Sequence, residues 1–200
     1  MKRFIYWMLI YNISLCVGTY CFKAAWVNIL ITAVYTLCLT AFYLCTKDSS
    51  EPVPYAKAVV CSIPLFAFAI ANIITIKTFT LHGAILLCLG AVAEELLFRG
   101  LLIRALHSLK AIARALVSSL VFALYHLVSG AGYIQAICAF CFGFALASFV
   151  LKYKKLTLCI LAHTVTNLFA CGETSTLLLV CCCVITVIYG YIQLKNNTEN

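Results

Sequence analysis

Long apolar runs separated by short polar turns constrain this chain more than any other feature of its sequence. A membrane-spanning helix requires about 20 largely apolar residues, and eight runs of roughly this length follow one another along the 200 residues. With 65% hydrophobic and 10% charged residues, the chain has too few polar side chains to cover a water-soluble globule. We therefore predict an all-α, polytopic membrane helix bundle and exclude a soluble enzyme, a secreted module and a disordered chain.

The predicted bundle forms one integral membrane domain, residues 1–200. The eight predicted spans are Phe4–Phe22, Ala25–Cys45, Lys57–Ile76, Phe79–Phe98, Ala111–Val128, Ala131–Leu151, Leu156–Ala170 and Thr174–Gln193. Residues 1–56 contain two leading spans and most of a proline-bearing linker, Thr46–Lys57, and residues 57–193 contain the other six spans. The motifs that carry chemistry lie in the core of this second region, residues 83–170.

The basic residues are divided unevenly between the two sides of the predicted bundle. If the N-terminus is cytoplasmic, eight spans place both termini and twelve of the 14 Lys and Arg residues on that side. Only Lys23 and Lys77 then lie on the other side, in agreement with the positive-inside rule. No basic cluster adjoins an aromatic surface of the kind that binds nucleic acid. We predict a multi-pass protein of the plasma membrane, with both termini cytoplasmic, lipid among its partners and no nucleic acid.

Two adjacent acidic residues, Glu94 and Glu95, lie within a predicted span. A carboxylate is costly in the hydrocarbon region, so an intramembrane acid indicates a functional site. Glu95 and Arg99 are one helical turn apart and can form an ion pair, whereas Glu94 points about 100° away around the helix. We expect this fourth helix to continue beyond Arg99 to an end near Arg104, which puts Glu94 close to mid-membrane.

Two further polar pairs follow with the same spacing, Phe122 with His126 and His163 with Asn167. At the helical rise, His126, His163 and Asn167 fall at a depth similar to that of Glu94. A buried Glu suits a general base, a His can share its proton, and a second His with an Asn can donate to an oxyanion. These groups suit activation of water against a carbonyl. A divalent metal such as zinc, held by Glu94, His126 and His163, is a second use for them.

These motifs resemble those of the CPBP family, which contains CAAX prenyl proteases and bacteriocin-processing enzymes and is also called the Abi family. The family pattern is EExxxR, then FxxxH, then HxxxN or HxxxB, on successive membrane helices. This chain has EELLFR at 94–99, FALYH at 122–126 and HTVTN at 163–167. The three motifs occur in the family order, and the resemblance covers residues 83–170.

The resemblance implies an intramembrane endopeptidase that hydrolyses a peptide bond of a lipid-modified or membrane-associated substrate. Carried over by motif position, Glu94 and His126 would activate the water, and His163 and Asn167 would form the oxyanion site. The remaining motif residues would support the site: Glu95, Arg99 and Phe122. The family is described both as metalloproteases and as glutamate peptidases without tightly bound metal, so the cofactor stays an open question.

The resemblance leaves two kinds of substrate open, a prenylated protein and a peptide precursor of the kind matured in bacteriocin processing. A short chain such as this one resembles the second group, and we expect the site to be reached from the cytosolic side. Two other functions are compatible with the same residues. One is a non-catalytic immunity or scaffold protein of the same fold. The other is a proton-coupled transporter, in which buried Glu and His relay protons.

Overall fold

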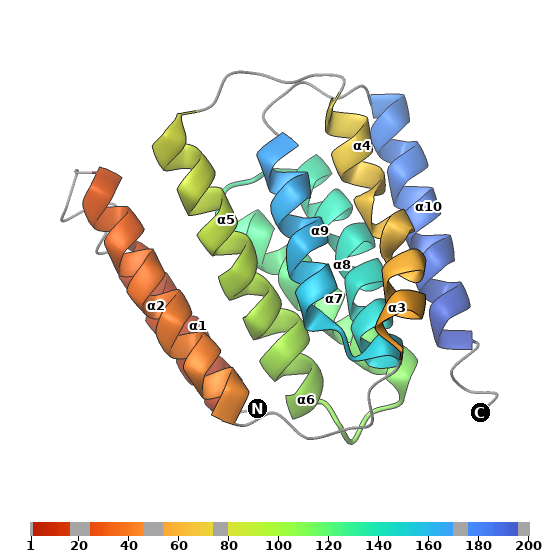
Figure 1. Ribbon diagram of the computed structural model, residues 1–200, viewed down its shortest axis with the longest axis horizontal. Helices are drawn as coiled ribbons and strands as arrows, with labels where there is room; N and C mark the ends of the chain where they lie inside the picture. Colours follow the sequence, from red (N-terminus) through yellow and green to blue (C-terminus); the bar gives the residue numbers. More distant parts are fainter. Residues whose placement is uncertain (1, 17–24, 46–53, 74–79, 170–175, 196–200) are drawn as a thin grey trace.

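The computed structural model describes residues 2–16, 25–45, 54–73, 80–169 and 176–195. Within these ranges all regular structure is helical, and the helices form eight rods that run side by side as one bundle (Figure 1). The predicted all-α membrane bundle is therefore confirmed. Most of the predicted linker, Thr46–Lys57, lies outside the described residues, as do Lys23 and Lys77.

Six of the rods are single helices and two are composite. The single helices are α1 (Lys2–Cys16), α2 (Ala25–Cys45), α7 (Ala111–Val128), α8 (Tyr133–Tyr153), α9 (Leu156–Phe169) and α10 (Thr176–Lys195). The third rod consists of α3 (Tyr55–Ser62), the 3₁₀ turn η2 (Ile63–Phe66) and α4 (Ala67–Ile73). The fourth consists of α5 (Leu81–Glu95), the π-helical segment η3 (Leu96–Leu102) and α6 (Ile103–Ala105).

The interruptions in the composite rods have different causes. Pro64 lies at the start of η2, and a proline inside a helix has no N–H to donate and crowds the preceding turn. The fourth rod continues through Arg99 to Ala105 without a break, so its predicted extension is confirmed. Its wide π-helical turn was not predicted. Ser118 of α7 stabilises this turn by donating from its hydroxyl to the carbonyl oxygen of Phe98 at 3.0 Å.

The outer surface of the bundle is apolar. Of the helices described, α2, α7, α8 and α10 are long and apolar enough to cross a membrane. Large aliphatic side chains stand exposed on their outer faces, among them Leu37, Leu124, Ile137 and Ile188. An apolar surface of this extent matches acyl chains and is unstable in water. The chain is therefore an integral membrane protein.

Helix α8 lies at the centre of the bundle, between α7 and α10, and most of its surface is buried. Small residues on one face, Ala139, Gly143 and Ala147, predict a close helix contact there. A Cβ added at Gly143 would lie 2.9 Å from Nη2 of Arg99 and 3.2 Å from Cδ1 of Phe122. The predicted close contact is confirmed, and it presses the middle of α8 against the motif-bearing helices.

The two ends of the bundle differ in charge. Lysine and arginine side chains gather at one end, where α1, α3, α7 and α9 begin and α2, α6, α8 and α10 finish, and we call this the basic end. Cation–π contacts connect neighbouring helices there, namely Arg3 with Phe42 at 5.9 Å, Arg104 with Tyr43 at 4.1 Å and Lys155 with Tyr55 at 5.5 Å. The opposite end includes the turn between α7 and α8, residues 129–132, which has no charged side chain.

Candidate active site

Glu95 is the centre of a buried polar network. Its side chain is fully buried at the last residue of α5. Oε1 accepts a hydrogen bond from Nη1 of Arg99 at 2.9 Å and another from Nδ1 of His163 at 2.8 Å. The predicted pairing of Glu95 with Arg99 is thus present, and it extends to α9. These two partners offset part of the cost of burying the carboxylate, whereas Oε2 is buried without a hydrogen-bond partner among the described residues.

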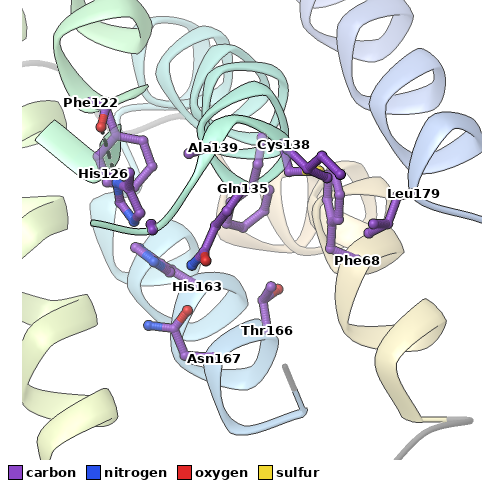
Figure 2. A pocket seen from close by; sticks show the side chains of 13 residues that line it. Phe68, Phe122, His126, Gln135, Cys138, Ala139, His163, Thr166, Asn167 and Leu179 are labelled. Carbon is purple, nitrogen blue, oxygen red and sulfur yellow. Dashed lines mark hydrogen bonds between the residues drawn. The ribbon is translucent and has the colours of Figure 1, made fainter. Parts of the chain in front are cut away.

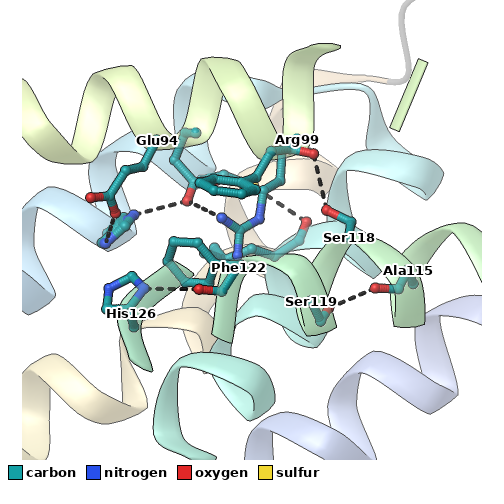
Figure 3. A network of polar contacts seen from close by, with 12 residues as sticks. Glu94, Arg99, Ala115, Ser118, Ser119, Phe122 and His126 are labelled. Atoms are coloured by element: carbon teal, nitrogen blue, oxygen red, sulfur yellow. Dashed lines mark hydrogen bonds and ion pairs between the residues drawn. The ribbon is translucent and has the colours of Figure 1, made fainter. Parts of the chain in front are cut away.

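Arg99 is held in the wide π-helical turn and is 1% exposed. Its guanidinium lies over the ring of Phe122, with Cζ 4.1 Å from the ring centroid, in a favourable cation–π geometry. Figure 3 shows this stack between α5 and α7, flanked by Glu94 on one side and Ser118 on the other. The contact brings the first and second motifs together, so Phe122 forms part of the wall around the site.

His163 lies between the two glutamates. Its Nδ1 donates to Glu95, and its Nε2 is 3.8 Å from Oε2 of Glu94. The Glu94 side chain keeps 14% of its surface exposed, whereas Glu95 is fully enclosed. The two adjacent carboxylates therefore differ as the helical geometry predicts: one is locked in an ion pair, and the other remains accessible beside an imidazole.

His126 is oriented by its own helix. Its Nδ1 donates to the carbonyl oxygen of Phe122 at 3.0 Å, which leaves Nε2 without a proton in the neutral ring. The ring packs edge-on against Phe122, with the centroids 4.4 Å apart. His126 and His163 thus have the same arrangement: in each ring Nδ1 donates to a protein acceptor, and Nε2 is available for a ligand.

Three of the four predicted catalytic residues, together with Phe122, line one cavity of about 350 Å³ between α4, α7, α8, α9 and α10. His126 comes from α7, and His163 and Asn167 come from α9; Figure 2 shows all three side chains facing the same space. Phe68 and Phe142 form part of its apolar wall. Glu94 does not line this cavity and reaches it through its contact with His163.

The cavity opens toward the end of the bundle opposite the basic end. Its rim includes Ala131 in the turn between α7 and α8, together with Ile134 and Gln135 in the first turn of α8. Both of these α8 residues are exposed. These rim residues lie at the end opposite the basic end. The expectation that the site is reached from the cytosolic side stays a prediction, because sequence depth alone does not say which end of a buried site is open.

The sequence reading missed two polar residues of the cavity, Gln135 and Thr166. The amide of Gln135 extends over the cavity toward His163 (Figure 2). The Oγ1 atom of Thr166 is buried and has no hydrogen-bond partner among the residues that the structure describes. Thr166 follows His163 by three residues on α9, so the helical spacing within the third motif could have indicated it. Gln135 has no such polar neighbour in the motifs, and only the packing of α8 against α9 reveals it.

The described side chains do not fit a resident metal ion. No group of three or more His, Cys, Asp or Glu side chains within the described ranges is arranged to hold one. Of the three predicted metal ligands, Glu94 and His163 approach each other within ion-pair distance, and within the described residues His126 has no such contact with either. Tight zinc sites use three or four converging ligands, so we derive the chemistry from the protein groups alone.

Comparison with known proteins supports the motif analysis. Residues 75–169 match the Rce1-like family, described as type II CAAX prenyl endopeptidase Rce1-like. The matched segment contains all three motifs, and it confirms the family resemblance. No curated protein and no solved structure is similar enough to the chain to give a match.

Proposed function

We propose that this chain is an intramembrane endopeptidase in which Glu94, His126, His163 and Asn167 carry out peptide hydrolysis. The Rce1-like family supports peptidase activity at the level of the family. The observation that carries the proposal is a cavity inside an apolar bundle, lined by two imidazoles and an amide from α7 and α9, with the Glu94 carboxylate of α5 beside the His163 imidazole. Polar groups are placed at this depth in a membrane when a function requires them.

Glu94 and His126 activate the hydrolytic water in this mechanism. Within the described structure no hydrogen bond joins the two side chains directly. In this mechanism the substrate water lies between them and contacts both. Glu94 accepts the proton as water attacks the carbonyl carbon, and Nε2 of His126 accepts a hydrogen bond from the same water. The proton then passes to the leaving amine, which completes hydrolysis into an acid and an amine.

Asn167 and His163 stabilise the oxyanion. The side-chain amide of Asn167 is a donor in the cavity, one helical turn beyond His163. Because Nδ1 of His163 donates to a carboxylate, its Nε2 donates only when the ring carries a second proton. Glu95 then serves as the counter-ion of that imidazolium. Donors aimed at the developing oxyanion contribute the largest single term in many hydrolases.

Glu95 and Arg99 act as positioning residues. Neither lines the cavity that holds the histidines, and both are buried in their mutual ion pair. Their task is to fix the tautomer and the orientation of His163, as a carboxylate does for histidine in other hydrolases. Phe122 supports the same arrangement by stacking on Arg99 and by accepting the hydrogen bond of His126.

The direction in which the cavity opens favours one of the two substrate classes. The positive-inside rule puts the basic end in the cytoplasm together with both termini, and the cavity opens toward the other end. A prenylated CAAX protein is a cytosolic substrate. A membrane-inserted or translocated peptide precursor reaches the cavity from the other side, and the apolar wall at Phe68 and Phe142 suits its hydrophobic side chains. We therefore favour a peptide precursor, cleaved in the plasma membrane.

The proposal is tested with Glu94→Gln and His126→Ala in the full-length chain. Peptides from cells expressing each variant are compared with those from cells expressing the wild type, and protein in the membrane fraction is quantified. Both variants should accumulate normally and leave uncleaved a set of precursors that the wild type cleaves. His82→Ala is the matched control, because His82 packs on Trp26 away from the cavity.

The same variants separate the alternative functions. If cells with Glu94→Gln or His126→Ala show the wild-type peptide pattern and full biological activity, the peptidase proposal is wrong and a scaffold or immunity role is favoured. Proton or substrate flux in proteoliposomes that both variants abolish, without any peptide cleavage by the wild type, would instead identify a transporter.

A further inference from the structure

A second cavity, of about 510 Å³, lies at the basic end of the bundle, between α2, α6, α7 and α8. Its lining contains five basic side chains, namely Arg99, Arg104, His107, Arg114 and Lys154. The rest of the lining is aliphatic or aromatic, and no acidic side chain contributes to it among the described residues. We call it the cationic cavity. A concentration of like charges in a partly buried space favours an anionic ligand.

Protein contacts hold two of these cations in place. Nε and Nη2 of Arg114 both donate to the carbonyl oxygen of Ile103, at 3.1 and 2.9 Å. The guanidinium of Arg104 lies over the Tyr43 ring, 4.1 Å from its centroid. Fixed guanidinium groups lose little side-chain entropy on binding, and their planar donors match the oxygens of a phosphate. The cationic cavity is thus preorganised.

Arg99 supplies an unsatisfied donor at the inner wall of the cationic cavity. It is 1% exposed, and only Nη1 is paired, with Glu95. Its Nε and Nη2 atoms are buried and have no hydrogen-bond partner within the described structure. Buried donors are almost always satisfied in native proteins. Oε2 of Glu95 is likewise buried without a hydrogen-bond partner among the described residues. Arg99 therefore brings a cation with spare donor capacity to the lining of the cationic cavity.

Lys154 is at the mouth of the cationic cavity, in the turn that follows α8. Its backbone is left-handed, with φ of 57°, and its side chain is exposed. Partial burial of the amine, and then the positive charge of Arg114, lower the pKa of Lys154. A neighbouring anion would relieve this repulsion. Both the inner and the outer parts of the cationic cavity thus lack a negative partner among the side chains that line it.

We propose that the cationic cavity binds the phosphate of an anionic phospholipid headgroup. Basic pockets between membrane helices at the cytoplasmic face are typical lipid headgroup sites. The aliphatic side chains of Ile103, Val150 and Leu151 in the same lining provide a surface for the glycerol and upper acyl chain. Free phosphate has no apolar part that could contact these aliphatic side chains. This inference does not depend on the peptidase activity.

The test measures lipid retention by the purified full-length protein. The protein is reconstituted in nanodiscs with equal amounts of phosphatidylglycerol and phosphatidylcholine, and the lipids it retains are counted by native mass spectrometry. The wild type should retain phosphatidylglycerol preferentially. Lys154→Asn should lower this preference about fivefold, since each basic residue near the surface contributes by that order. Asparagine tolerates the left-handed backbone, so the turn is preserved.

The matched control is Lys155→Asn, which removes the same charge from the adjacent residue outside the cationic cavity. His107→Gln is a second variant of the lining. His107 is exposed, so this substitution should leave the fold intact. Equal retention of the two lipids, or equal losses in Lys154→Asn and Lys155→Asn, overturns the proposal. If inorganic phosphate binds with a dependence on Lys154 while phosphatidylglycerol does not, the lipid assignment is wrong.

Discussion

The two cavities use positive charge in opposite ways, although they lie in one small bundle and Arg99 borders the network between them. Around the histidine cavity every charge has a partner: Glu95 pairs with Arg99 and His163, and Glu94 lies beside His163. In the cationic cavity, basic side chains gather without an acidic one in the lining. Paired charges give defined orientation, as catalysis requires, whereas a gathering of like charges gives affinity for an external anion.

The largest expected effect concerns which end of the bundle each cavity faces. In a cysteine-free variant, Lys110→Cys at the basic end and Gln135→Cys at the rim of the histidine cavity should react with a membrane-impermeant maleimide from opposite sides of the membrane. The outcome is all-or-none, because the reagent does not cross the bilayer. Labelling of both positions from one side contradicts the eight-span topology.

Loss of the shared arginine should destabilise the bundle strongly. Arg99→Met leaves Glu95 buried without its cation, which costs about 3–5 kcal/mol in free energy of unfolding. Lys154→Asn, at the mouth of the cationic cavity, removes an exposed charge and should change stability little. Thermal unfolding in detergent measures both. Similar losses in the two variants would mean that the Glu95–Arg99 pair is no better integrated than a surface charge.

Removal of the amide donor should affect rate rather than stability. Asn167→Ala is expected to lower the cleavage rate about 10²–10³-fold, as loss of one oxyanion donor does in other hydrolases. The measurement is the rate of precursor cleavage in membranes, together with the unfolding temperature. Asn12→Ala is the control, since Asn12 is exposed on α1 and its side chain donates to the carbonyl oxygen of Met8 on the same helix. Unchanged cleavage by Asn167→Ala would remove this residue from the mechanism.

The smallest expected effect concerns the packing that separates the cavities. Gly143→Ala puts a Cβ 2.9 Å from Nη2 of Arg99 and 3.2 Å from the Phe122 ring, so we expect a loss of about 1–3 kcal/mol. Gly90→Ala meets nothing closer than 3.9 Å and should gain about 0.5–1 kcal/mol through lower chain entropy. Opposite signs in denaturant or thermal unfolding support the close contact; a neutral Gly143→Ala contradicts it.

Much of the fold follows directly from the order of residues. Hydropathy and length predict the rods from α1 to α10, and the spacing of Glu95 and Arg99 predicts their ion pair, because both depend on periodicity along one helix. The expected extension of the fourth rod to Arg104 also follows, since Glu94 must lie deep enough to meet α7. The π-helical turn cannot be predicted in this way. The same apolar sequence fits an α-helix or a π-helix, which differ in the pattern of backbone hydrogen bonds.

The arrangement between helices was decided by tertiary packing alone. The sequence pointed to Glu94 and His126 as partners, yet the imidazole next to both glutamates is that of His163, since α5 packs directly against α9. The open end of the histidine cavity and the gathering of five basic side chains likewise depend on which helix ends meet. Periodicity determines which face a residue occupies; only the packing of helices determines what that face contacts.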